Sequence, residues 1–213
     1  MTAAAVLEAG QLTVRRMGRA IFRDIEVSLS PGQLLQVTGP NGAGKTSLLR
    51  VLTSLLQPAE GGLRWHGRAI GMGDAEYLSA LAYIGHTNGI DVDLSAAENL
   101  RFAARMHDAP AQASAIHNAL ACLGLEAVGS ISVRALSQGQ RRRVSLARLA
   151  LAPRQLWLLD EPLTSLDQGC AACFVALLDA HLASGGMAVI ATHQLPPQRG
   201  AVLDLATPSR RPT

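Results

Sequence analysis

A glycine-rich stretch near the start of the chain holds residues that could bind a triphosphate. The chain has 19 lysine and arginine residues, and its only lysine, Lys45, lies in this stretch. The stretch fits the pattern G-x-x-x-x-G-K-[ST], in which glycines let backbone N–H groups turn inward around an anion. A compact ammonium can reach between phosphates from within such a loop, whereas a guanidinium is larger and has a fixed fork geometry. The predicted phosphate-binding residues are Gly39, Pro40, Asn41, Gly42, Ala43, Gly44, Lys45, Thr46 and Ser47.

Two adjacent carboxylates could supply the metal-binding and hydrolytic parts of the same site. They are Asp160 and Glu161, and they follow the hydrophobic run at residues 155–159. With a triphosphate bound upstream, we expect Asp160 to hold Mg²⁺ through water and the hydroxyl of Thr46 to bind the same ion. Glu161 is expected to lie beside the terminal phosphate and to polarise the attacking water. The alternative is a strand end with two solvated acids.

A further run that we expect to be buried, at residues 187–193, ends in a histidine. A lone histidine is usually structural. At the carboxyl end of a strand, however, a neutral imidazole can donate one hydrogen bond and accept another. We therefore predict that His193 senses the terminal phosphate.

A second candidate anion site opens a predicted helix at residues 140–152. Serine, glycine and a helix N-terminus can bind an anion together. The glycine-rich stretch already serves one end of a nucleotide, so this second site makes most sense if it contacts a nucleotide held by another copy of the chain. A simple helix N-cap is the alternative. The residues concerned are Ser137, Gln138, Gly139 and Gln140.

A run of three arginines and a pair of cysteines invite other interpretations. We interpret Arg141, Arg142 and Arg143 as a partly solvated helix face rather than a nucleic-acid patch. Cys170 and Cys173 lie in a helical pattern, and no second pair of cysteines or histidines follows at zinc spacing. We expect these two thiols to be buried and inert.

Short apolar runs separated by helical runs must position these residues. Such alternation predicts an α/β fold with a mainly parallel sheet. The parallel strands are expected at residues 33–39, 81–85, 155–160, 187–193 and 201–206. An antiparallel β portion is expected nearer the N-terminus, at residues 11–16, 22–29 and a hairpin at 63–70.

Helical periodicity marks a second group of segments. The predicted helices cover residues 46–56, 96–106, 111–123 and 168–184. Gly124 and the pair Gly185-Gly186 are expected to end the last two of them. The long helical stretch interrupts the alternation of strands and helices. We therefore predict one domain over residues 1–213, with an α/β core at 1–85 and 152–213 and a helical subdomain at about 86–151.

Composition agrees with one sizeable core. The 213 residues are 48% hydrophobic and 16% charged, with a net charge of +3. The mild basicity is better explained by an overall preference for arginine than by nucleic-acid binding. Neither a signal peptide nor a run of 18 apolar residues is apparent. We therefore expect a cytoplasmic protein that meets a membrane only through a partner.

Taken in order, these motifs resemble those of the ATP-binding subunits of ABC transporters. GPNGAGKT resembles the Walker A motif, LSQGQ the signature motif, LWLLDEP the Walker B motif, and His193 the switch histidine. The segment from Ser165 to Asp167 resembles the D-loop, which would bring Asp167 to the nucleotide. The resemblance implies an ATPase that uses ATP and Mg²⁺ and works as a head-to-tail dimer. Each ATP would lie between one Walker A motif and the signature residues of the other copy.

A narrower resemblance covers residues 83–90 (YIGHTNGI) and 94–102 (LSAAENLRF). These segments, with GQRRRVSLARL and THQ further on, are similar to the haem exporter ATPase of the cytochrome c maturation system. That family implies a role in c-type cytochrome biogenesis at the cytoplasmic face of the bacterial inner membrane. It also implies an integral-membrane permease subunit and cytochrome c maturation proteins as partners. Haem export and release of haem from a chaperone both remain open.

The chain departs from the general ABC pattern at two positions. His86 stands where a glutamine usually reaches Mg²⁺, and a neutral imidazole could take its place. No aromatic residue lies where one usually stacks on adenine. Arg16 could stack through its guanidinium instead, or Phe22 could shift into that position.

Two other function classes fit parts of the pattern. A soluble mechanochemical ATPase, such as one of iron–sulfur cluster assembly, would share the same dimer, and the YIGHTNGI stretch argues against it. A regulatory module that binds ATP without hydrolysis would not need Glu161 and His193, both of which are present.

Overall fold

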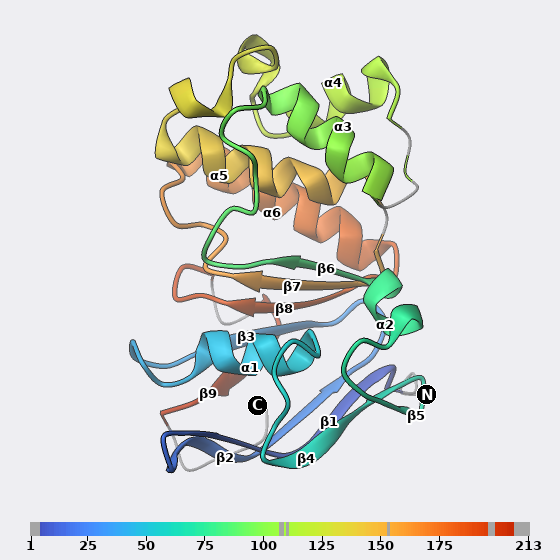
Figure 1. Ribbon diagram of the computed structural model, residues 1–213, viewed down its shortest axis with the longest axis vertical. Coiled ribbons are helices and arrows are strands. Elements are labelled where there is room, and N and C mark those ends of the chain that lie inside the picture. Colours follow the sequence, from blue (N-terminus) through green and yellow to red (C-terminus); the bar gives the residue numbers. More distant parts are fainter. Residues whose placement is uncertain (1–4, 107–108, 110, 153, 196–198, 207–213) are drawn as a thin grey trace. The chain divides into compact units, whose positions relative to one another are not determined.

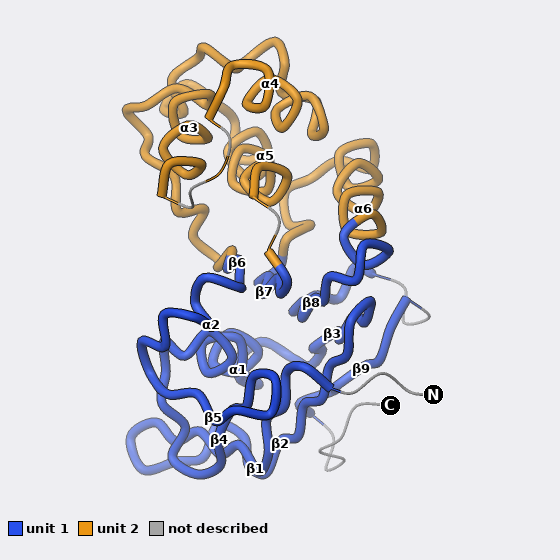
Figure 2. The backbone as a smooth tube through the Cα atoms, turned by 90° about the vertical axis from the view of Figure 1, so that its right-hand side faces the viewer, with its two compact units in different colours: residues 1–83, 155–161, 181–213 blue, residues 84–154, 162–180 orange. Residues whose placement is uncertain are grey.

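The computed structural model describes residues 5–106, 109, 111–152, 154–195 and 199–206 (Figure 1). Its internal contacts divide the chain into two compact units, which Figure 2 colours separately. Unit 1 comprises residues 1–83, 155–161 and 181–213, and unit 2 comprises residues 84–154 and 162–180. Each unit is therefore built from stretches that are far apart in the sequence.

A five-stranded sheet carries the strands predicted to be parallel. Its order is β6-β7-β8-β3-β9. The strands are β3 (Leu34–Thr38), β6 (Leu81–Ile84), β7 (Leu156–Asp160), β8 (Met187–Ala191) and β9 (Ala201–Asp204). β3 pairs in parallel with both β8 and β9, and β7 pairs in parallel with β8. Every residue of β7 and β8 is buried, which is why all of them are apolar except Asp160 at the end of β7.

The N-terminal strands form a separate antiparallel sheet with the order β2-β1-β4-β5. Its strands are β1 (Leu7–Arg16), β2 (Arg19–Leu29), β4 (Glu60–Trp65) and β5 (Arg68–Ile70). Leu7 pairs with Leu29 on one side and with Trp65 on the other. The prediction of an α/β fold with both a parallel and an antiparallel portion is thus confirmed.

The core of unit 1 lies around the helix that follows β3. This helix, α1 (Lys45–Leu52), is shorter than the sequence predicts, and Figure 1 shows it between the two sheets. Its buried leucines, Leu48, Leu49 and Leu52, join one apolar cluster with residues of β1, β3 and β8. Burial of a leucine contributes about 1.5–3 kcal/mol, so this contact fixes where α1 begins relative to the sheets.

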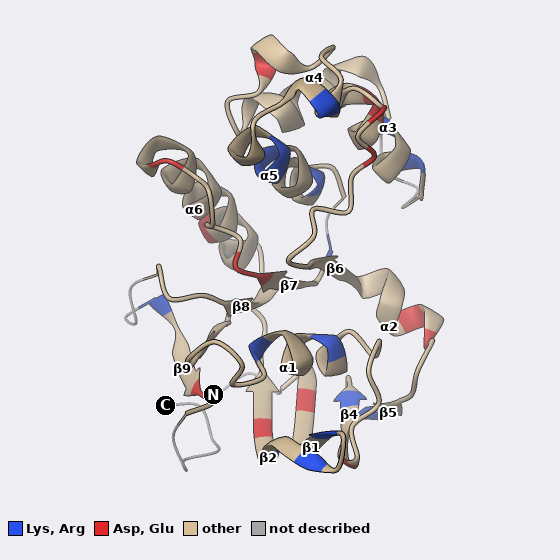
Figure 3. Cartoon of the chain, turned by 60° about the vertical axis from the view of Figure 1, so that its left-hand side comes forward, with Lys and Arg blue, Asp and Glu red and all other residues tan. Residues whose placement is uncertain are grey.

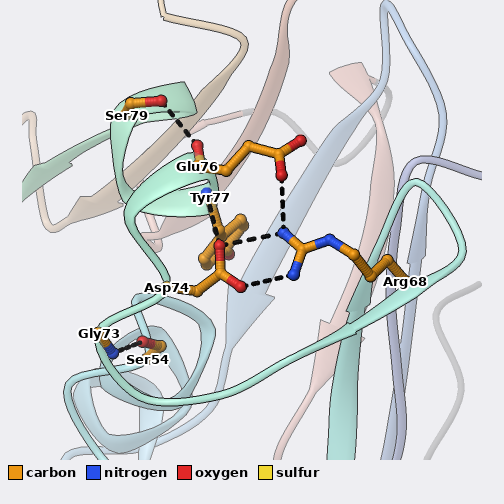
Figure 4. Close-up of polar contacts among 7 residues, drawn as sticks. All are labelled: Ser54, Arg68, Gly73, Asp74, Glu76, Tyr77 and Ser79. Atoms are coloured by element: carbon orange, nitrogen blue, oxygen red, sulfur yellow. Dashed lines mark hydrogen bonds and ion pairs between the residues drawn. The ribbon is translucent and has the colours of Figure 1, made fainter.

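A short helix that the sequence pattern does not predict, α2 (Ala75–Ala80), precedes β6. Asp74 caps it by accepting a hydrogen bond from the backbone N–H of Tyr77 at 3.1 Å. Arg68 donates to both carboxylate oxygens of Asp74, at 2.7 and 3.0 Å, and to Glu76 at 3.0 Å (Figure 4). The buried hydroxyl of Tyr77 donates to the carbonyl of Leu52. These contacts tie α2 to the end of α1 and set the start of β6.

Unit 2 is mainly helical. It contains α3 (Ala96–Met106), α4 (Ala113–Ala121), α5 (Gln138–Ala147) and most of α6 (Gln168–Ala183). Three short 3₁₀ turns, Glu126–Val128, Val133–Ala135 and Arg148–Ala150, connect or extend them. Figure 2 shows these helices as the orange part of the chain.

Glycines end α4 and α6, as the sequence predicts. Gly124 has φ +62° and Gly185 has φ +88°, conformations that suit glycine. After α6, the N–H of Gly185 donates to Leu182 and the N–H of Gly186 donates to His181, both at 3.0 Å. These two bonds form a Schellman motif, which satisfies carbonyls that the helix leaves unpaired.

The arginine run on α5, among the basic residues that Figure 3 colours blue, binds backbone carbonyls within unit 2. Arg141 donates to the carbonyls of residues 133 and 134, and Arg143 donates to those of residues 123 and 124. Arg142 is only 5% exposed, so the prediction of a partly solvated face is wrong for this residue. Its guanidinium was expected at the surface because charge usually stays solvated, but the carbonyls around it provide hydrogen bonds in place of water.

The prediction that Cys170 and Cys173 are buried is also wrong. Cys173 is exposed and Cys170 is partly exposed. Only Phe174 and Leu178 are buried on α6, so most of this apolar helix is in contact with solvent in the single chain. Among the residues that the structure describes, no helix has the length and apolar character needed to cross a membrane.

Candidate functional site

The glycine-rich stretch joins the end of β3 to the start of α1. Gly39, Gly42 and Gly44 all have positive φ, at +128°, +86° and +103°. A Cβ on Gly44 would lie 2.6 Å from Ile21 and 2.9 Å from Phe22. Because the loop backbone is in direct contact with β2 at this point, only glycine fits there. This loop conformation exposes backbone N–H groups ahead of a helix N-terminus, which is the arrangement that binds anions.

Lys45 bends back over the beginning of this loop. Its ammonium donates to the carbonyl of Gly39 at 2.7 Å and to that of Pro40 at 3.3 Å. The residue is 8% exposed. A single positive charge is thereby held at the centre of the loop, at the N-terminal end of α1.

The hydroxyl of Thr46 connects the loop to the carboxylate strand. It donates to Oδ2 of Asp160 across 2.7 Å. Asp160 is the last residue of β7 and is 2% exposed. A hydroxyl and a carboxylate that face each other are hard oxygen ligands of the kind that Mg²⁺ prefers.

The register of the sheet sets the positions of the other two predicted catalytic residues. Asp160 lies opposite Ala191 of β8. The N–H of Glu161 then donates to the carbonyl of Ala191 at 2.8 Å, and Glu161 takes the unusual φ of +49°. His193 follows two residues after Ala191 and is exposed. Because neighbouring parallel strands end at the same edge, Glu161, His193 and the loop after β3 all leave the sheet on one side, where ligands of such sheets bind.

A contact between two residues near the site, Tyr83 and Arg50, is not predicted from the sequence. Tyr83 on β6 receives a hydrogen bond from Arg50 of α1. Its pKa is raised, first by burial and then by the charge of Asp160. The order of the sheet, which makes β6 the neighbour of β7, brings them together. The motif YIGHTNGI points to Tyr83, but nothing in the sequence pairs it with Arg50.

The signature residues cap α5 in unit 2. The hydroxyl of Ser137 accepts from the N–H of Gln140 at 3.2 Å, and the side-chain carbonyl of Gln140 accepts from the N–H of Ser137 at 2.9 Å. This is a complete capping box. A Cβ on Gly139 would lie 2.5 Å from the carbonyl oxygen of Ser165. The segment that precedes α6 is therefore in contact with the first turn of α5.

Asp167 caps α6 in the same unit. Its carboxylate accepts from the backbone N–H of Cys170 at 2.8 Å and from the Cys170 thiol at 3.4 Å. These two hydrogen bonds, the backbone one first, lower the pKa of Asp167. Its side chain therefore acts as a helix cap within the single chain.

The loop that carries His86 is held by α5. Arg142 donates to the carbonyl of Gly85 at 2.9 Å, and Ser145 donates to the carbonyl of Asn88 at 2.6 Å. His86 itself is exposed. The backbone of this loop is thus fixed on both sides of the histidine.

The predicted site residues fall into two groups. Residues 39–47, Asp160, Glu161 and His193 lie in unit 1, whereas His86, residues 137–140 and Asp167 lie in unit 2. Arg16 is exposed at the end of β1 in unit 1. Phe22 is 6% exposed and belongs to the core. The alternative in which its ring stacks on a base is therefore not supported.

Sequence comparison places these motifs in a known family. The ABC transporter family matches residues 22–164. The cytochrome c biogenesis ATP-binding export protein CcmA 2 of Cupriavidus metallidurans is 63% identical over 208 residues, which cover 98% of this chain and 99% of that protein. The corresponding CcmA protein of Methylococcus capsulatus is 46% identical over 185 residues, covering 87% of this chain and 89% of that protein.

Structural comparison agrees at the level of the fold. A putative ABC transporter ATP-binding protein from Pyrococcus furiosus aligns with a TM-score of 0.83 at 22% sequence identity. The alignment covers 94% of this chain and 97% of that one. The chain therefore belongs to the ABC transporter family of ATP-binding proteins, within its group of cytochrome c biogenesis ATP-binding export proteins.

Proposed function

We propose that this chain is the ATP-hydrolysing subunit of an ABC transporter complex in c-type cytochrome biogenesis, acting in haem export or in release of haem from its chaperone. The observation that carries the ATPase assignment is the 2.7 Å hydrogen bond between Thr46 and Asp160. It joins the phosphate-binding loop to the carboxylate strand. The pathway is supported by the relatives, which are named as ATP-binding export proteins of cytochrome c biogenesis.

The chain's own groups would divide the work of hydrolysis. Backbone N–H groups of residues 39–47 and the ammonium of Lys45 would bind the phosphates. Glu161 would orient the attacking water and accept its proton, and His193 would donate a hydrogen bond to the terminal phosphate. Thr46 and Asp160 would hold Mg²⁺, which supplies charge neutralisation for the phosphates when it is bound.

Residues of unit 2 would complete the site of a second copy. The first turn of α5, with Ser137, Gln138, Gly139 and Gln140, presents a helix N-terminus, and Asp167 lies at the start of α6. Their partners within the single chain are capping bonds, which leave the backbone at residues 138 and 139 for an anion. We propose a head-to-tail homodimer that encloses two ATP molecules, with Asp167 at the interface.

The domain organisation and the partners follow from the same proposal. The whole chain, residues 1–213, would be one ATPase domain with an α/β core at 1–85 and 152–213 and a helical subdomain at about 86–151. An integral-membrane permease and cytochrome c maturation proteins would hold it at the cytoplasmic face of the bacterial inner membrane. His86, exposed on a loop fixed by Arg142, would reach Mg²⁺ or the permease. The exposed Arg16 would stack on adenine.

Replacement of Glu161 by glutamine tests the hydrolytic role. The amide keeps the shape of the side chain but cannot accept a proton, so Glu161→Gln is expected to bind ATP normally and to hydrolyse it about 10²–10⁴-fold more slowly. ATP binding would be measured by isothermal titration calorimetry and turnover by phosphate release. Glu60→Gln, which changes an exposed glutamate on β4, should leave both values unchanged. Turnover of Glu161→Gln within twofold of the wild type would contradict the role.

Affinity capture from detergent-solubilised membranes tests the pathway. A tagged full-length chain is expected to recover a multi-span membrane subunit together with haem-handling proteins. Recovery of soluble iron–sulfur scaffold proteins alone would reject the proposed pathway while leaving the ATPase assignment in place.

A further inference from the structure

Two cysteines at the start of α6 share one helix face and are accessible to solvent. Cys170 and Cys173 are three residues apart, which makes their side chains neighbours on the helix surface. Cys173 is exposed and Cys170 is partly exposed. The pKa of Cys170 is raised by burial and by Asp167, and also by the nearby Cys173. The nucleotide site described above uses neither of them.

The position of the pair within α6 makes a bond between the two sulfurs feasible. Helix neighbours three residues apart have Cβ atoms about 5–6 Å apart, whereas a disulfide needs about 3.5–4.5 Å. The first turn must therefore loosen by about 1–2 Å for the bond to form. Cys170 lies in the first turn of α6, whose N–H groups have no partners within the helix, and its own N–H is held only by the Asp167 side chain. Its backbone can therefore move towards Cys173, in the second turn, more easily than that of an interior residue.

The two thiols differ in their surroundings. Burial and the hydrogen bond to Asp167 raise the pKa of Cys170. Cys173 is the more exposed of the two residues, so we expect an external reagent to reach it first. Cys170 would then attack it from within the helix, once its thiol leaves the carboxylate of Asp167.

We propose that Cys170 and Cys173 are a redox-sensitive pair, which a low-molecular-weight disulfide such as glutathione disulfide converts into an intrahelical disulfide. The Cys173 thiolate attacks one sulfur of the reagent and expels one glutathione thiolate. The Cys170 thiolate then attacks the Cys173 sulfur and expels the second. Overall, the S–S bond of the reagent is replaced by one between Cys170 and Cys173, and the two S–H bonds of the protein are replaced by two on glutathione. The two protons go to the departing glutathione, with Asp167 next to Cys170 as the acceptor that relays one of them.

The new bond would act on Asp167 and, through it, on the signature residues. Closing the disulfide removes the Cys170 thiol that donates to Asp167. It also loosens the first turn of α6, in which Asp167 caps the N–H of Cys170. Asp167 ends the segment that includes Ser165, whose carbonyl is in contact with Gly139. Oxidation would thus displace the segment that holds the first turn of α5. Its effect on ATP turnover rests on the proposed function, whereas its effect on the cap does not.

The test uses the purified full-length chain treated with glutathione disulfide. Intact mass should fall by about 2 Da with no glutathione retained, as expected for an internal disulfide. Peptide mapping should join residues 170 and 173. Amide hydrogen exchange at Cys170 should accelerate at least about fivefold, which corresponds to loss of a typical N-cap. ATP turnover should fall about fivefold or more and recover with dithiothreitol, if the first turn of α6 is needed in the dimer.

Three variants make the outcome decisive. Cys122→Ser removes the third thiol and should behave like the wild type, whereas Cys173→Ser should lose the response. Asp167→Asn retains a helix cap but removes the charge that raises the pKa of Cys170, so its disulfide should form faster. A persistent glutathione adduct on Cys173, or a disulfide between two chains, would overturn the proposal. If the wild-type chain forms the disulfide but hydrolyses no ATP before oxidation, the proposed function fails while the redox proposal stands.

Discussion

At the residue scale, the ammonium of Lys45 is held by two backbone carbonyls of the loop in which it lies. Its two acceptors are the carbonyls of Gly39 and Pro40, at 2.7 and 3.3 Å. A guanidinium has the same charge, but its donors lie in a rigid plane at the end of a bulkier group. An arginine at this position is therefore not expected to make the same contacts, although it has the same charge.

Replacement of Lys45 by arginine should weaken ATP binding in spite of the conserved charge. We expect a loss of at least about tenfold in affinity, since misplacing one charge-assisted contact costs 1.4 kcal/mol or more. Calorimetric titration with Mg-ATP would measure it. Arg19→Lys, at an exposed position of β2, is the reciprocal change and should have no effect. Equal ATP affinity in Lys45→Arg and the wild type would show that the site does not require an ammonium.

At the scale of elements, the start of α2 combines a helix cap with an ion pair. Asp74 accepts from Tyr77 and from Arg68, and these bonds, the one from Arg68 first, lower its pKa from 3.8 to about 2. A carboxyl whose pKa is lower in the folded state stabilises the fold at a pH above its unfolded value. The contribution of Asp74 is therefore complete above pH 4 and is lost as the pH falls towards 2.

Two substitutions at Asp74 separate these contributions. Asparagine is as good an N-cap as aspartate, so Asp74→Asn should retain the cap and lose only the ion pair with Arg68. Asp74→Ala should lose both and melt at a lower temperature than Asp74→Asn. Denaturant titrations at several pH values would measure the stabilities. The difference between wild type and Asp74→Asn should shrink below pH 4, and a difference that grows on acidification would contradict the assignment.

Sequence patterns predicted some elements better than others for physical reasons. β7 and β8 were predictable because strands buried on both faces are apolar at nearly every position, Asp160 at the end of β7 being the exception. α2 was missed because six residues are too few to show helical periodicity. The exposure of Cys170 and Cys173 was not predicted, because a mainly apolar helix is usually buried. The sequence of α6 does not reveal that only Phe174 and Leu178 are covered.

The same distinction applies to the site. The loop from Gly39 to Ser47 was predictable because the glycines and the lysine that bind an anion lie within one short stretch of sequence. The contact of Tyr83 with Arg50 was not, because it depends on which strand lies beside β7. Burial of Arg142 was not predictable either, since its carbonyl partners come from residues 20 and 57 positions away.

At the scale of the whole molecule, a head-to-tail dimer predicts complementation between two inactive chains. Lys45→Ala should abolish phosphate binding, and Ser137→Glu should repel the nucleotide held by the other copy. Each homodimer would then have no intact site, whereas a mixed dimer would have one. Equal mixing should therefore restore about a quarter of the wild-type ATPase rate, because half the dimers are mixed and each has one of two sites intact.

This complementation is measured by phosphate release after the two chains are mixed and allowed to exchange. Recovery of untagged Lys45→Ala chains together with tagged wild-type chains is the control for exchange between dimers. If the mixture of the two variants recovers no ATPase activity although their chains exchange, each site is built from a single chain. Melting curves of both variants would confirm that they are folded.

The solitary ammonium also makes the chain suitable for spectroscopy. The other basic side chains belong to arginine and histidine, so protein produced with isotopically enriched lysine would carry one labelled side chain. Its resonance would come from a group with fixed carbonyl neighbours at the start of α1. A single peak, free of overlap and needing no assignment, would then report occupancy of the phosphate-binding loop even within a large membrane assembly.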